Sequence, residues 1–464
     1  MDGLECSEIK ISALELTKRI DSEYYRKLFL DYDTCVQSIP NKLLGRVSDF
    51  LIGPFGSAYN TDNYVEASPY RYVRGQDVKP FVLKDIEPKY IAENDYARLS
   101  KYALKEKDIL VSVVGTLGNA CIVRNRDIPA IFSCKSTVIR TSELSPEYLV
   151  TYLNCKYGRQ LLLRKERGAI QKGLNLDDLK SLLVPLWGDK LDCAIGGIIT
   201  LADTKLDSSK KIYAEAEQFL LSALSMANFA PTEQPVSVKL ISESFVESGR
   251  LDAEYYQPKY DGYNLLVSNY VSGFKRVRDL FDPIKTKCLR TEEQYQYIEI
   301  GDVNVGDGST MFNTVATEDL PDNAKILAQK GDVLVSTVRP NRGAVAIVPE
   351  DKLLVSGAFT VLRQKSDYPK ELLQVLLRTP LYKDWLLRYN VGTSYPVIKD
   401  EDVLNMPLPL FDEQIQQNVI TSVQESFTLR QQSEQLLENA KRAVEIAIEY
   451  GEEKAMEWLK DKAE

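Results

Sequence analysis

A cluster of basic side chains lies between residues 156 and 172, and phosphate binding is the chemistry that it could perform. The cluster contains Lys156, Arg159, Arg164, Lys165, Arg167 and Lys172, with Glu166 as the acidic residue among them. Ammonium and guanidinium groups bind phosphate oxygens, so this cluster predicts a surface that contacts the backbone of a nucleic acid. A solvent-exposed helix face is the alternative interpretation.

Other side chains have the donor and acceptor geometry that base edges require. Arginine and lysine suit guanine, and asparagine and glutamine suit adenine. The candidates are Arg71, Arg74, Gln76, Asn119, Lys135 and Gln171 in the first half of the chain, and Arg290, Gln294, Arg339, Asn341, Arg342 and Tyr395 in the second. The segment Arg339–Arg342 is the best placed, because it follows a predicted strand that ends at Ser336.

Several enzyme classes are excluded by residues that the chain lacks. It has no histidine, which removes Ser-His-Asp triads, HExxH zinc sites and nucleases with a histidine base. It also has no P-loop and no Asn-Pro-Pro or Asp-Pro-Pro motif of the amino-methyltransferase type. Seven cysteines without a CxxC pair predict reduced thiols and no metal site. A rival nuclease hypothesis rests on Asp322, Glu350 and Lys352, although a loop followed by a turn explains the same residues.

The charge of the chain constrains its partners. Its formal net charge is −9, whereas a protein that binds nucleic acid alone is usually basic. Local basic surfaces or a partner subunit must therefore supply the phosphate contacts. No apolar run is long enough for a membrane span, and the acidic segment Met1–Glu5 lacks a signal sequence. We therefore predict a cytoplasmic protein that does not contact membranes.

The elements that would position these side chains occur twice. Arg19–Tyr25 (RIDSEYY) returns as Arg250–Tyr256 (RLDAEYY), 231 residues later. Four further blocks recur in the same order, with offsets of 223 to 225 residues. One of these is Asp108–Ser112, which matches Asp332–Ser336. The sequence therefore predicts a duplicated domain of mixed α/β structure, in which shared blocks form the framework and differing stretches form two distinct sites.

A long helix is predicted to follow each domain. Apolar and small residues recur at steps of three and four over residues 195–227 and 415–450. The main seam positions are Ile195, Ile199, Leu206, Tyr213 and Leu220 in the first helix, and Ile415, Val419, Leu429 and Leu436 in the second. We expect the two helices to pack together, antiparallel. The alternative is that each helix packs only on its own domain.

Together these blocks resemble the specificity (S) subunit of type I restriction–modification systems, over essentially the whole chain. The resemblance rests on the Arg-Ile/Leu-Asp-Ser/Ala-Glu-Tyr-Tyr and Asp-Ile/Val-Leu-Val-Ser motifs, on residues 168–186 before the first helix, and on the order domain, helix, domain, helix. It implies an α+β fold with two target-recognition domains, residues 1–187 and 237–411. It also implies two helical conserved regions, residues 188–236 and 412–464, packed as an antiparallel coiled coil.

The resemblance also implies a function without chemistry in this chain. Each domain would recognise one half of a split double-stranded DNA target, and the helices would set the gap. Two modification subunits would dock and methylate adenine, with or without two restriction subunits. S-adenosylmethionine, ATP and Mg²⁺ would be bound by those partners, and no cofactor by this chain. The alternatives are a specificity module of a related defence system, with a fused methyltransferase–nuclease as partner, and a two-domain scaffold that binds protein.

Overall fold

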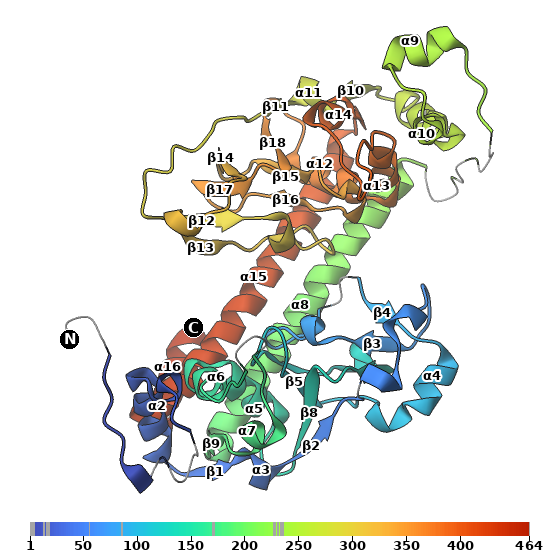
Figure 1. Ribbon diagram of the computed structural model, residues 1–464. Coiled ribbons are helices and arrows are strands. Elements are labelled where there is room, and N and C mark those ends of the chain that lie inside the picture. Colours follow the sequence, from blue (N-terminus) through green and yellow to red (C-terminus); the bar gives the residue numbers. More distant parts are fainter. Residues whose placement is uncertain are drawn as a thin grey trace. The chain divides into compact units, whose positions relative to one another are not determined.

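The computed structural model describes residues 5–12, 14, 19–54, 56–84, 87–168, 172–225, 229, 232 and 236–463 (Figure 1). The chain forms two compact units. Unit 1 comprises residues 1–205 and 431–464, and unit 2 comprises residues 206–430. Two long helices, α8 (Asp189–Ala223) and α15 (Glu413–Tyr450), each contribute one part to each unit.

Unit 1 contains a four-stranded antiparallel sheet in the order β2 (Ser48–Ile52), β8 (Ser136–Thr141), β5 (Ile109–Ser112) and β6 (Ala120–Ile122). All four residues of β5 are buried, which explains its continuous β-branched and apolar sequence. A three-stranded sheet has the order β4 (Lys89–Tyr90), β3 (Arg71–Val73) and β7 (Ala130–Phe132), and β3 runs parallel to β7. Strands β1 (Asn41–Leu43) and β9 (Leu183–Pro185) form a separate pair.

Unit 2 repeats this topology strand by strand. Its first sheet has the order β11 (Phe281–Pro283), β18 (Phe359–Gln364), β15 (Val333–Ser336) and β16 (Val345–Ile347). Its second has the order β13 (Asn313–Ala316), β12 (Gln294–Ile298), β17 (Leu353–Ser356) and β14 (Ala324–Ala328). Strands β10 (Phe274–Arg276) and β19 (Pro407–Pro409) pair as β1 and β9 do. The duplication inferred from the sequence is thus a duplication of fold, with β14 as the added strand.

Each unit also contains short helices. Unit 1 has α2 (Lys27–Gln37), α3 (Leu44–Val47), α4 (Glu93–Arg98), α5 (Pro146–Asn154), α6 (Lys156–Leu163), α7 (Leu176–Lys180) and the C-terminal α16 (Glu452–Ala463). Unit 2 has α9 (Phe245–Ser248), α10 (Pro258–Ser268), α11 (Val277–Leu280), α12 (Lys370–Arg378), α13 (Pro380–Leu387) and α14 (Asp400–Asn405). The repeated Tyr-Tyr motif forms the 3₁₀ turns η1 (Ser22–Tyr25) and η9 (Ala253–Tyr256).

The sequence pattern predicts one helix over residues 146–167, and that prediction is wrong. Cys155 is extended, with ψ of 166°, so it ends α5 and begins α6. The two helices then pack so closely that a Cβ at Gly158 would overlap the carbonyl oxygen of Tyr152. The second repeat breaks at Thr379, which caps α13 before Pro380. The Thr-Pro pair is the sequence signal that predicts this break.

The two long helices pack on each other within each unit. In unit 1, Ile195 and Ile199 of α8 share a buried cluster with Ala440, Ala443 and Ala447 of α15. In unit 2, Leu220 shares a cluster with Val419, and Tyr213 stacks on Phe427 at 6.5 Å between ring centroids. Four predicted seam residues are only half-buried: Leu206, Ile415, Leu429 and Leu436. The same clusters contain domain residues, so each helix also packs on its own domain.

The serines of the seam explain how polar residues fit between these helices. The Ser433 hydroxyl donates to the carbonyl oxygen of Ala202 at 2.6 Å in unit 1. In unit 2 the Ser426 hydroxyl donates to the carbonyl oxygen of Ser209 at 2.8 Å. In unit 1, Glu452 accepts from the amide of Leu191 at 3.2 Å. Rising residue numbers in α8 meet falling numbers in the C-terminal segment, so the predicted antiparallel pairing is confirmed.

The first helix ends earlier than predicted. Helix α8 stops at Ala223, and Ser225 adopts a left-handed conformation with φ of 60°. Ala227 and both prolines expected to end the helix, Pro231 and Pro235, lie outside the described residues. Among the residues that the structure describes, no helix is both long and apolar enough to cross a membrane.

Candidate nucleic-acid interface

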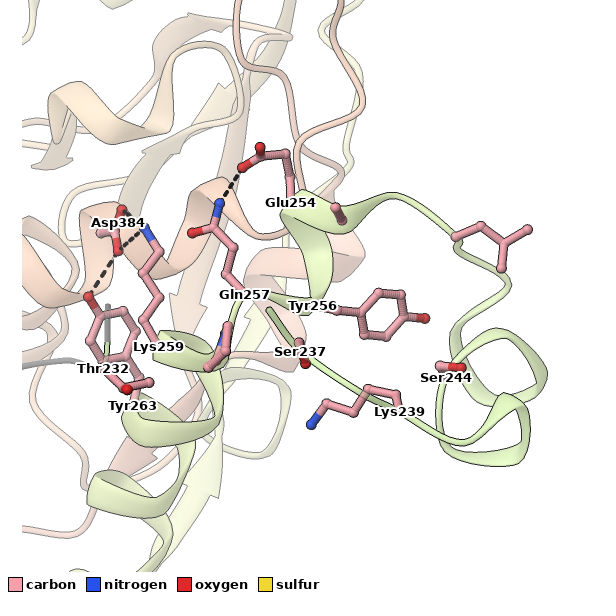
Figure 2. Close-up of a pocket in the computed structure, with 13 residues that line it drawn as sticks. Thr232, Ser237, Lys239, Ser244, Glu254, Tyr256, Gln257, Lys259, Tyr263 and Asp384 are labelled. Carbon is pink, nitrogen blue, oxygen red and sulfur yellow. Dashed lines mark hydrogen bonds and ion pairs between the residues drawn. The ribbon is translucent and has the colours of Figure 1, made fainter. Parts of the chain in front are cut away.

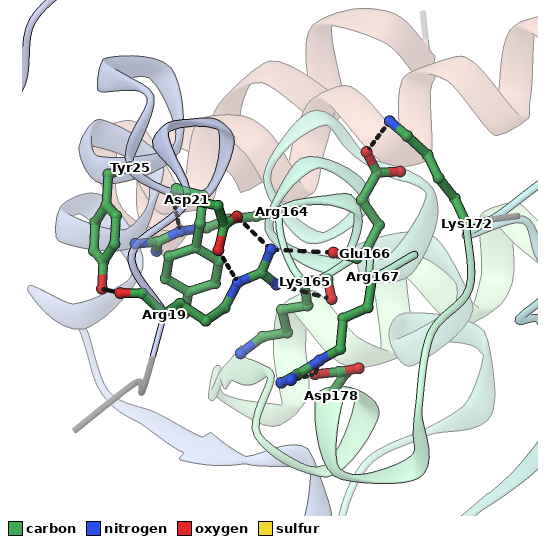
Figure 3. Close-up of polar contacts among 10 residues, drawn as sticks. Arg19, Asp21, Tyr25, Arg164, Lys165, Glu166, Arg167, Lys172 and Asp178 are labelled. Carbon is green, nitrogen blue, oxygen red and sulfur yellow. Dashed lines mark hydrogen bonds and ion pairs between the residues drawn. The ribbon is translucent and has the colours of Figure 1, made fainter. Parts of the chain in front are cut away.

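Arg164, the centre of the predicted phosphate-binding cluster, is held by the body of unit 1 (Figure 3). It is 8% exposed, and its Nε donates to the carbonyl oxygen of Tyr24 at 2.8 Å. Its Nη1 pairs with Asp33 at 2.9 Å, and the guanidinium lies 4.2 Å from the Tyr24 ring centroid. These contacts consume the donors that a phosphate would need.

Arg19 of the repeated motif fastens to the same turn. Its guanidinium pairs with Asp21 and donates to the carbonyl oxygens of Lys165 and Glu166, at 3.3 and 3.2 Å (Figure 3). The hydrogen bond from Arg19 lowers the pKa of Asp21. The Tyr25 hydroxyl donates back to the carbonyl oxygen of Arg19 at 3.1 Å. We call this set of contacts the clasp.

The second repeat contains the same clasp. Arg250 pairs with Asp252 and donates to the carbonyl oxygen of Asn390 at 2.9 Å. Tyr256 donates to the carbonyl oxygen of Arg250 at 2.9 Å, as Tyr25 does to Arg19. Arg388 takes the place of Arg164 and donates to the carbonyl oxygen of Tyr255 at 3.1 Å. The motif that repeats in the sequence therefore stabilises the fold of each unit.

The other five basic residues of the predicted cluster also have partners within unit 1. Lys156 pairs with Glu449 at 2.5 Å, and Arg159 donates to Asn119 Oδ1 at 2.9 Å. Lys165 donates to Ser181 at 3.0 Å, and desolvation lowers the pKa of Lys165. The two remaining residues, Arg167 and Lys172, pair with Asp178 and Glu166. Their side chains are 54% and 61% exposed, which leaves them the most accessible members of the cluster. Phosphate binding here stays a prediction.

In the first repeat, three of the predicted base-contacting residues serve the fold. Arg71 is 8% exposed and donates to the carbonyl oxygen of Lys84. Arg74 pairs with Asp77 at 2.7 Å. Asn119 is 4% exposed and donates to the carbonyl oxygen of Val78 at 3.2 Å. The partners of Arg71 and Asn119 lie 13 and 41 residues away in the sequence, and a sequence pattern does not reveal them.

Two other predicted residues of the first repeat do reach the surface. Gln76 and Lys135 are both exposed. Their turns touch, since a Cβ at Gly75 would lie 2.7 Å from the Cβ of Lys135. An amide and an ammonium group thus lie on adjacent turns. Gln171 lies outside the described residues.

In the second repeat, most of the predicted residues gather at one turn. Arg339 begins the 3₁₀ turn η12 (Pro340–Arg342), and its guanidinium lies 5.4 Å from the ring centroid of Tyr395. Asn341 and Arg342 are exposed on the same turn. The structure therefore brings four of the six predicted residues together. Of the other two, Gln294 is exposed on β12, and Arg290 donates to the carbonyl oxygens of Pro321 and Ala324.

The backbone of Arg339 is strained. Its φ of 52° lies in the left-handed region, which disfavours side chains with a Cβ. The counterpart in the first repeat is Gly115, with φ of 87°. Strained residues persist where the surrounding structure imposes them, and they cluster at functional sites. The second repeat thus keeps an arginine where the geometry would favour glycine.

Arg378, a residue that sequence reasoning missed, fixes η12 from behind. It is 4% exposed, and its guanidinium donates to the carbonyl oxygens of Gly343 and Val305 at 2.9 and 3.1 Å. Its Nε also donates to the hydroxyl of Tyr213 on α8 at 2.8 Å. Burial raises the pKa of Tyr213 to about 12. A buried arginine therefore joins the exposed turn to the long helix.

A hollow of about 770 Å³ in unit 2 is lined by polar side chains, several of which bond to one another (Figure 2). Asp384 accepts from Lys259 at 2.8 Å and from the Tyr263 hydroxyl at 2.9 Å. Gln257 donates to Glu254, three residues before it. The contacts of Asp384 hold α10 against α13, so we assign the hollow a structural role.

The residues of the rival nuclease hypothesis do not meet. Asp322 precedes β14, and Glu350 and Lys352 precede β17. These strands are antiparallel, with Ala324 opposite Ser356 and Ala328 opposite Leu353. The two groups therefore lie at opposite ends of the strand pair, at least ~10 Å apart at ~3.3 Å per residue. Among the described residues, no group of three His, Cys, Asp or Glu side chains could hold a metal ion.

Part of the chain is similar to known proteins. Residues 272–440 match the model of the type I restriction modification DNA specificity domain. The type I restriction enzyme HindI specificity subunit of Haemophilus influenzae is 30% identical over 136 residues, which is 27% of this chain and 29% of that subunit. The second half of the chain is therefore similar to the type I restriction modification DNA specificity domain, and the chain spans less than a third of the length of this relative.

Two solved structures align with most of the chain at low sequence identity. The type I restriction–modification S subunit from M. genitalium is 14% identical, with a TM-score of 0.38, over 89% of this chain and 95% of that one. The HsdS subunit from Thermoanaerobacter tengcongensis is 15% identical, with a TM-score of 0.29, over 89% of this chain and 96% of that one.

Proposed function

We propose that this chain is the non-catalytic DNA-recognition subunit of a cytoplasmic type I restriction–modification complex. Each repeat contacts one half of a split double-stranded target, and the paired helices set the gap between the halves. Two modification subunits dock on the chain and transfer methyl groups from S-adenosylmethionine. Restriction subunits that use ATP and Mg²⁺ complete the assembly where they are present. The chain itself binds none of these cofactors.

One observation carries this proposal: the two repeats share one fold but expose different side chains at matching turns. The turn after β15 carries Arg339, Asn341 and Arg342, while the turn after β5 carries Gly115 and the buried Asn119. Different exposed side chains on the same fold would suit the recognition of two different DNA half-sites. The net charge of −9 is consistent with a chain that depends on partner subunits to enclose DNA.

The base-contact assignment can be tested with Arg339→Gly. Glycine suits the left-handed backbone at this position, so we expect the variant to fold as the parent does. A bidentate contact to guanine contributes about 1–3 kcal/mol of discrimination. We therefore expect methylation mapping in cells that carry the chain and its modification subunit to show relaxed specificity at one half-site only. Lys275→Gly, at an exposed position on β10, is the control.

The gap can be tested by shortening both helices together. Removing residues 206–212 from α8 and 423–429 from α15 preserves the pairing of Ala202 with Ser433. Seven helical residues span about 10 Å, which equals roughly three base pairs of DNA. We expect the unspecified gap in the methylation map to shrink by about that amount, or methylation to cease. A gap of unchanged length would exclude the helices as its determinant.

A gel shift separates this function from a protein-binding scaffold. The recognition subunit should shift its mapped DNA target when the modification subunit is present. A scaffold would bind the partner and leave the DNA unshifted.

A further inference from the structure

A basic pocket of about 170 Å³ opens on unit 2, and no residue of η12 lines it. It is formed by β14, by the turn between β17 and β18, and by the segment that follows β11. Three lysines line it, Lys285, Lys287 and Lys325, and all three are exposed. One carboxylate, Asp400, lies among them. The lining thus has an excess of two positive charges.

Backbone pairing brings these lysines together. Lys287 forms an antiparallel bridge with Ile326, and the amide of Cys288 donates to the carbonyl oxygen of Lys325 at 2.8 Å. The segment after β11 therefore lies along β14. The register of β14 shifts between Ala324 and Ile326, so Lys325 is the extra residue of a bulge. Bulges change the direction of a side chain at the edge of a site.

The pocket does not neutralise its own charge. Asp400 accepts a hydrogen bond from the Thr360 hydroxyl at 2.7 Å and pairs with Lys285 at 4.0 Å. Within the described part of the chain, neither Lys287 nor Lys325 has an ion-pair partner. Like charges held together are unfavourable, and an anion in the pocket would relieve that repulsion.

The first repeat has other residues at the place of these lysines. At the place of β14 it has the 3₁₀ turn η5 (Ser100–Tyr102), where Lys101, the counterpart of Lys325, lies 4.8 Å from the ring centroid of Tyr102. Strand pairing makes Leu51 the counterpart of Ile284, because they face the matching residues Val138 and Val361. Gly53, two residues further on, packs on the backbone of Ser133, where a Cβ would overlap the carbonyl group. Ile52 and Pro54 thus stand where the second repeat has Lys285 and Lys287, so the cluster of three lysines is particular to the second repeat.

We propose that Lys285, Lys287 and Lys325 bind a phosphate of the DNA backbone and orient the second domain on its half-site. This inference rests on the proposed function and deepens it, because it assigns backbone contacts to the repeat that lacks the cluster of residues 156–172. Ammonium groups contact phosphates as point charges, without selecting a base. The pocket therefore supplies affinity, and the turn at Arg339 supplies specificity.

The test uses the full chain in complex with its modification subunit, on DNA that carries the mapped target. The variant Lys285→Gln/Lys287→Gln/Lys325→Gln is compared with the parent between 50 and 200 mM salt. Each lost phosphate contact reduces the slope of log K against log salt by about 0.9. We expect the parent to lose roughly 3–4-fold more affinity than the variant over this range, with the preferred sequence unchanged.

The matched control replaces three exposed lysines elsewhere on unit 2: Lys275→Gln/Lys330→Gln/Lys352→Gln. It removes the same charge, so an equal change in salt dependence would mean that total charge, and not the pocket, governs binding. An unchanged salt slope in the pocket variant, with DNA bound by the parent, overturns the pocket and leaves the proposed function standing. Weaker recovery of the modification subunit at an unchanged slope would make the pocket a protein contact. A parent complex that does not bind the DNA would overturn both the pocket and the proposed function.

Discussion

The two repeats agree in their internal contacts and differ in their exposed turns. In the first, Arg140 forms two hydrogen bonds of 2.8 Å with Asp108, and in the second Arg363 forms two of 2.8 Å with Asp332. The clasps match in the same way, and so does the strand order of the main sheets. The comparison teaches which repeated residues hold the fold and which positions remain available for recognition.

The difference is clearest at the end of the first helix after the main sheet. Asn154 ends α5 and donates to the carbonyl oxygen of Ala120 at 2.8 Å. Arg378 ends α12 at the matching position and reaches three carbonyl groups and Tyr213. The longer side chain supports the turn that exposes Arg339. The second repeat has therefore built a buried support for a surface feature that the first repeat lacks.

The largest expected effect comes from removing that support. Arg378→Ala leaves buried carbonyl groups without donors, at about 1–3 kcal/mol each. We expect unit 2 to lose about 4 kcal/mol, whereas Asn154→Ala should cost unit 1 about 1–2 kcal/mol. Hydrogen exchange of β15 peptides reports on unit 2, and that of β5 peptides on unit 1. Equal losses in the two units would remove the asymmetry described here.

The buried aspartates should behave alike. Asp332→Ala and Asp108→Ala each break a pair whose acid is 2–3% exposed. Breaking a fully buried pair costs about 3–5 kcal/mol. Because Arg363 and Arg140 are 38% and 34% exposed, we expect about 2–3 kcal/mol in each unit. The same exchange measurement applies, with the exposed Asp322→Ala as control. A loss of stability in one repeat alone would show that the two ion pairs, although alike in geometry, contribute differently to stability.

Arg164 and Arg388, which lie beside the two clasps, should contribute unequally to stability. Arg164 has an ion pair with Asp33, and among the described residues Arg388 has no such pair. Arg164→Ala should therefore cost about 2 kcal/mol and Arg388→Ala about 1 kcal/mol. Thermal unfolding with exchange mapping measures both. The salt dependence of DNA binding should not change in either variant. A decrease of about 0.9 in the slope for Arg164→Ala would instead restore it as a phosphate contact.

The smallest expected effect is the loss of stability at low pH. Hydrogen bonds from Arg19 and Arg250 lower the pKa of Asp21 and Asp252 below the usual value near 4. Each carboxylate therefore contributes stability that is present above about pH 4 and is lost as pH falls through the lowered pKa. Between pH 5 and 3, the parent should lose more stability than Asp21→Asn/Asp252→Asn. Parallel curves would mean that the clasps are electrostatically neutral.

Periodicity and repetition predicted the framework well. The duplicated blocks located β5 and β15, and the heptad pattern located both long helices, because these features repeat along the chain itself. The break at Cys155 was missed, since tertiary packing around Gly158 overrides the local helical pattern. Local sequence does not report such close contact between backbones.

The candidate site was harder to predict for a different physical reason. A run of basic residues shows charge but not the partners of that charge. Arg164 is held by Asp33, and Lys156 by Glu449, which is 293 residues away. Exposed arginines in a turn after a strand were a better guide, because turns at strand ends stay accessible. The basic pocket was missed because it depends on a bulge at Lys325.

The interleaved make-up of the two units has a consequence for synthesis. Unit 2 is one continuous stretch, residues 206–430, whereas unit 1 needs the segment 431–464, which emerges from the ribosome after unit 2. Until then, Ile195 and Ile199 lack the alanines of α15, and the start of α8 lacks Glu452. Synthesis of unit 1 thus begins first, yet unit 1 is completed after unit 2. Until then the apolar face of α8 stays exposed, and a chaperone could bind it.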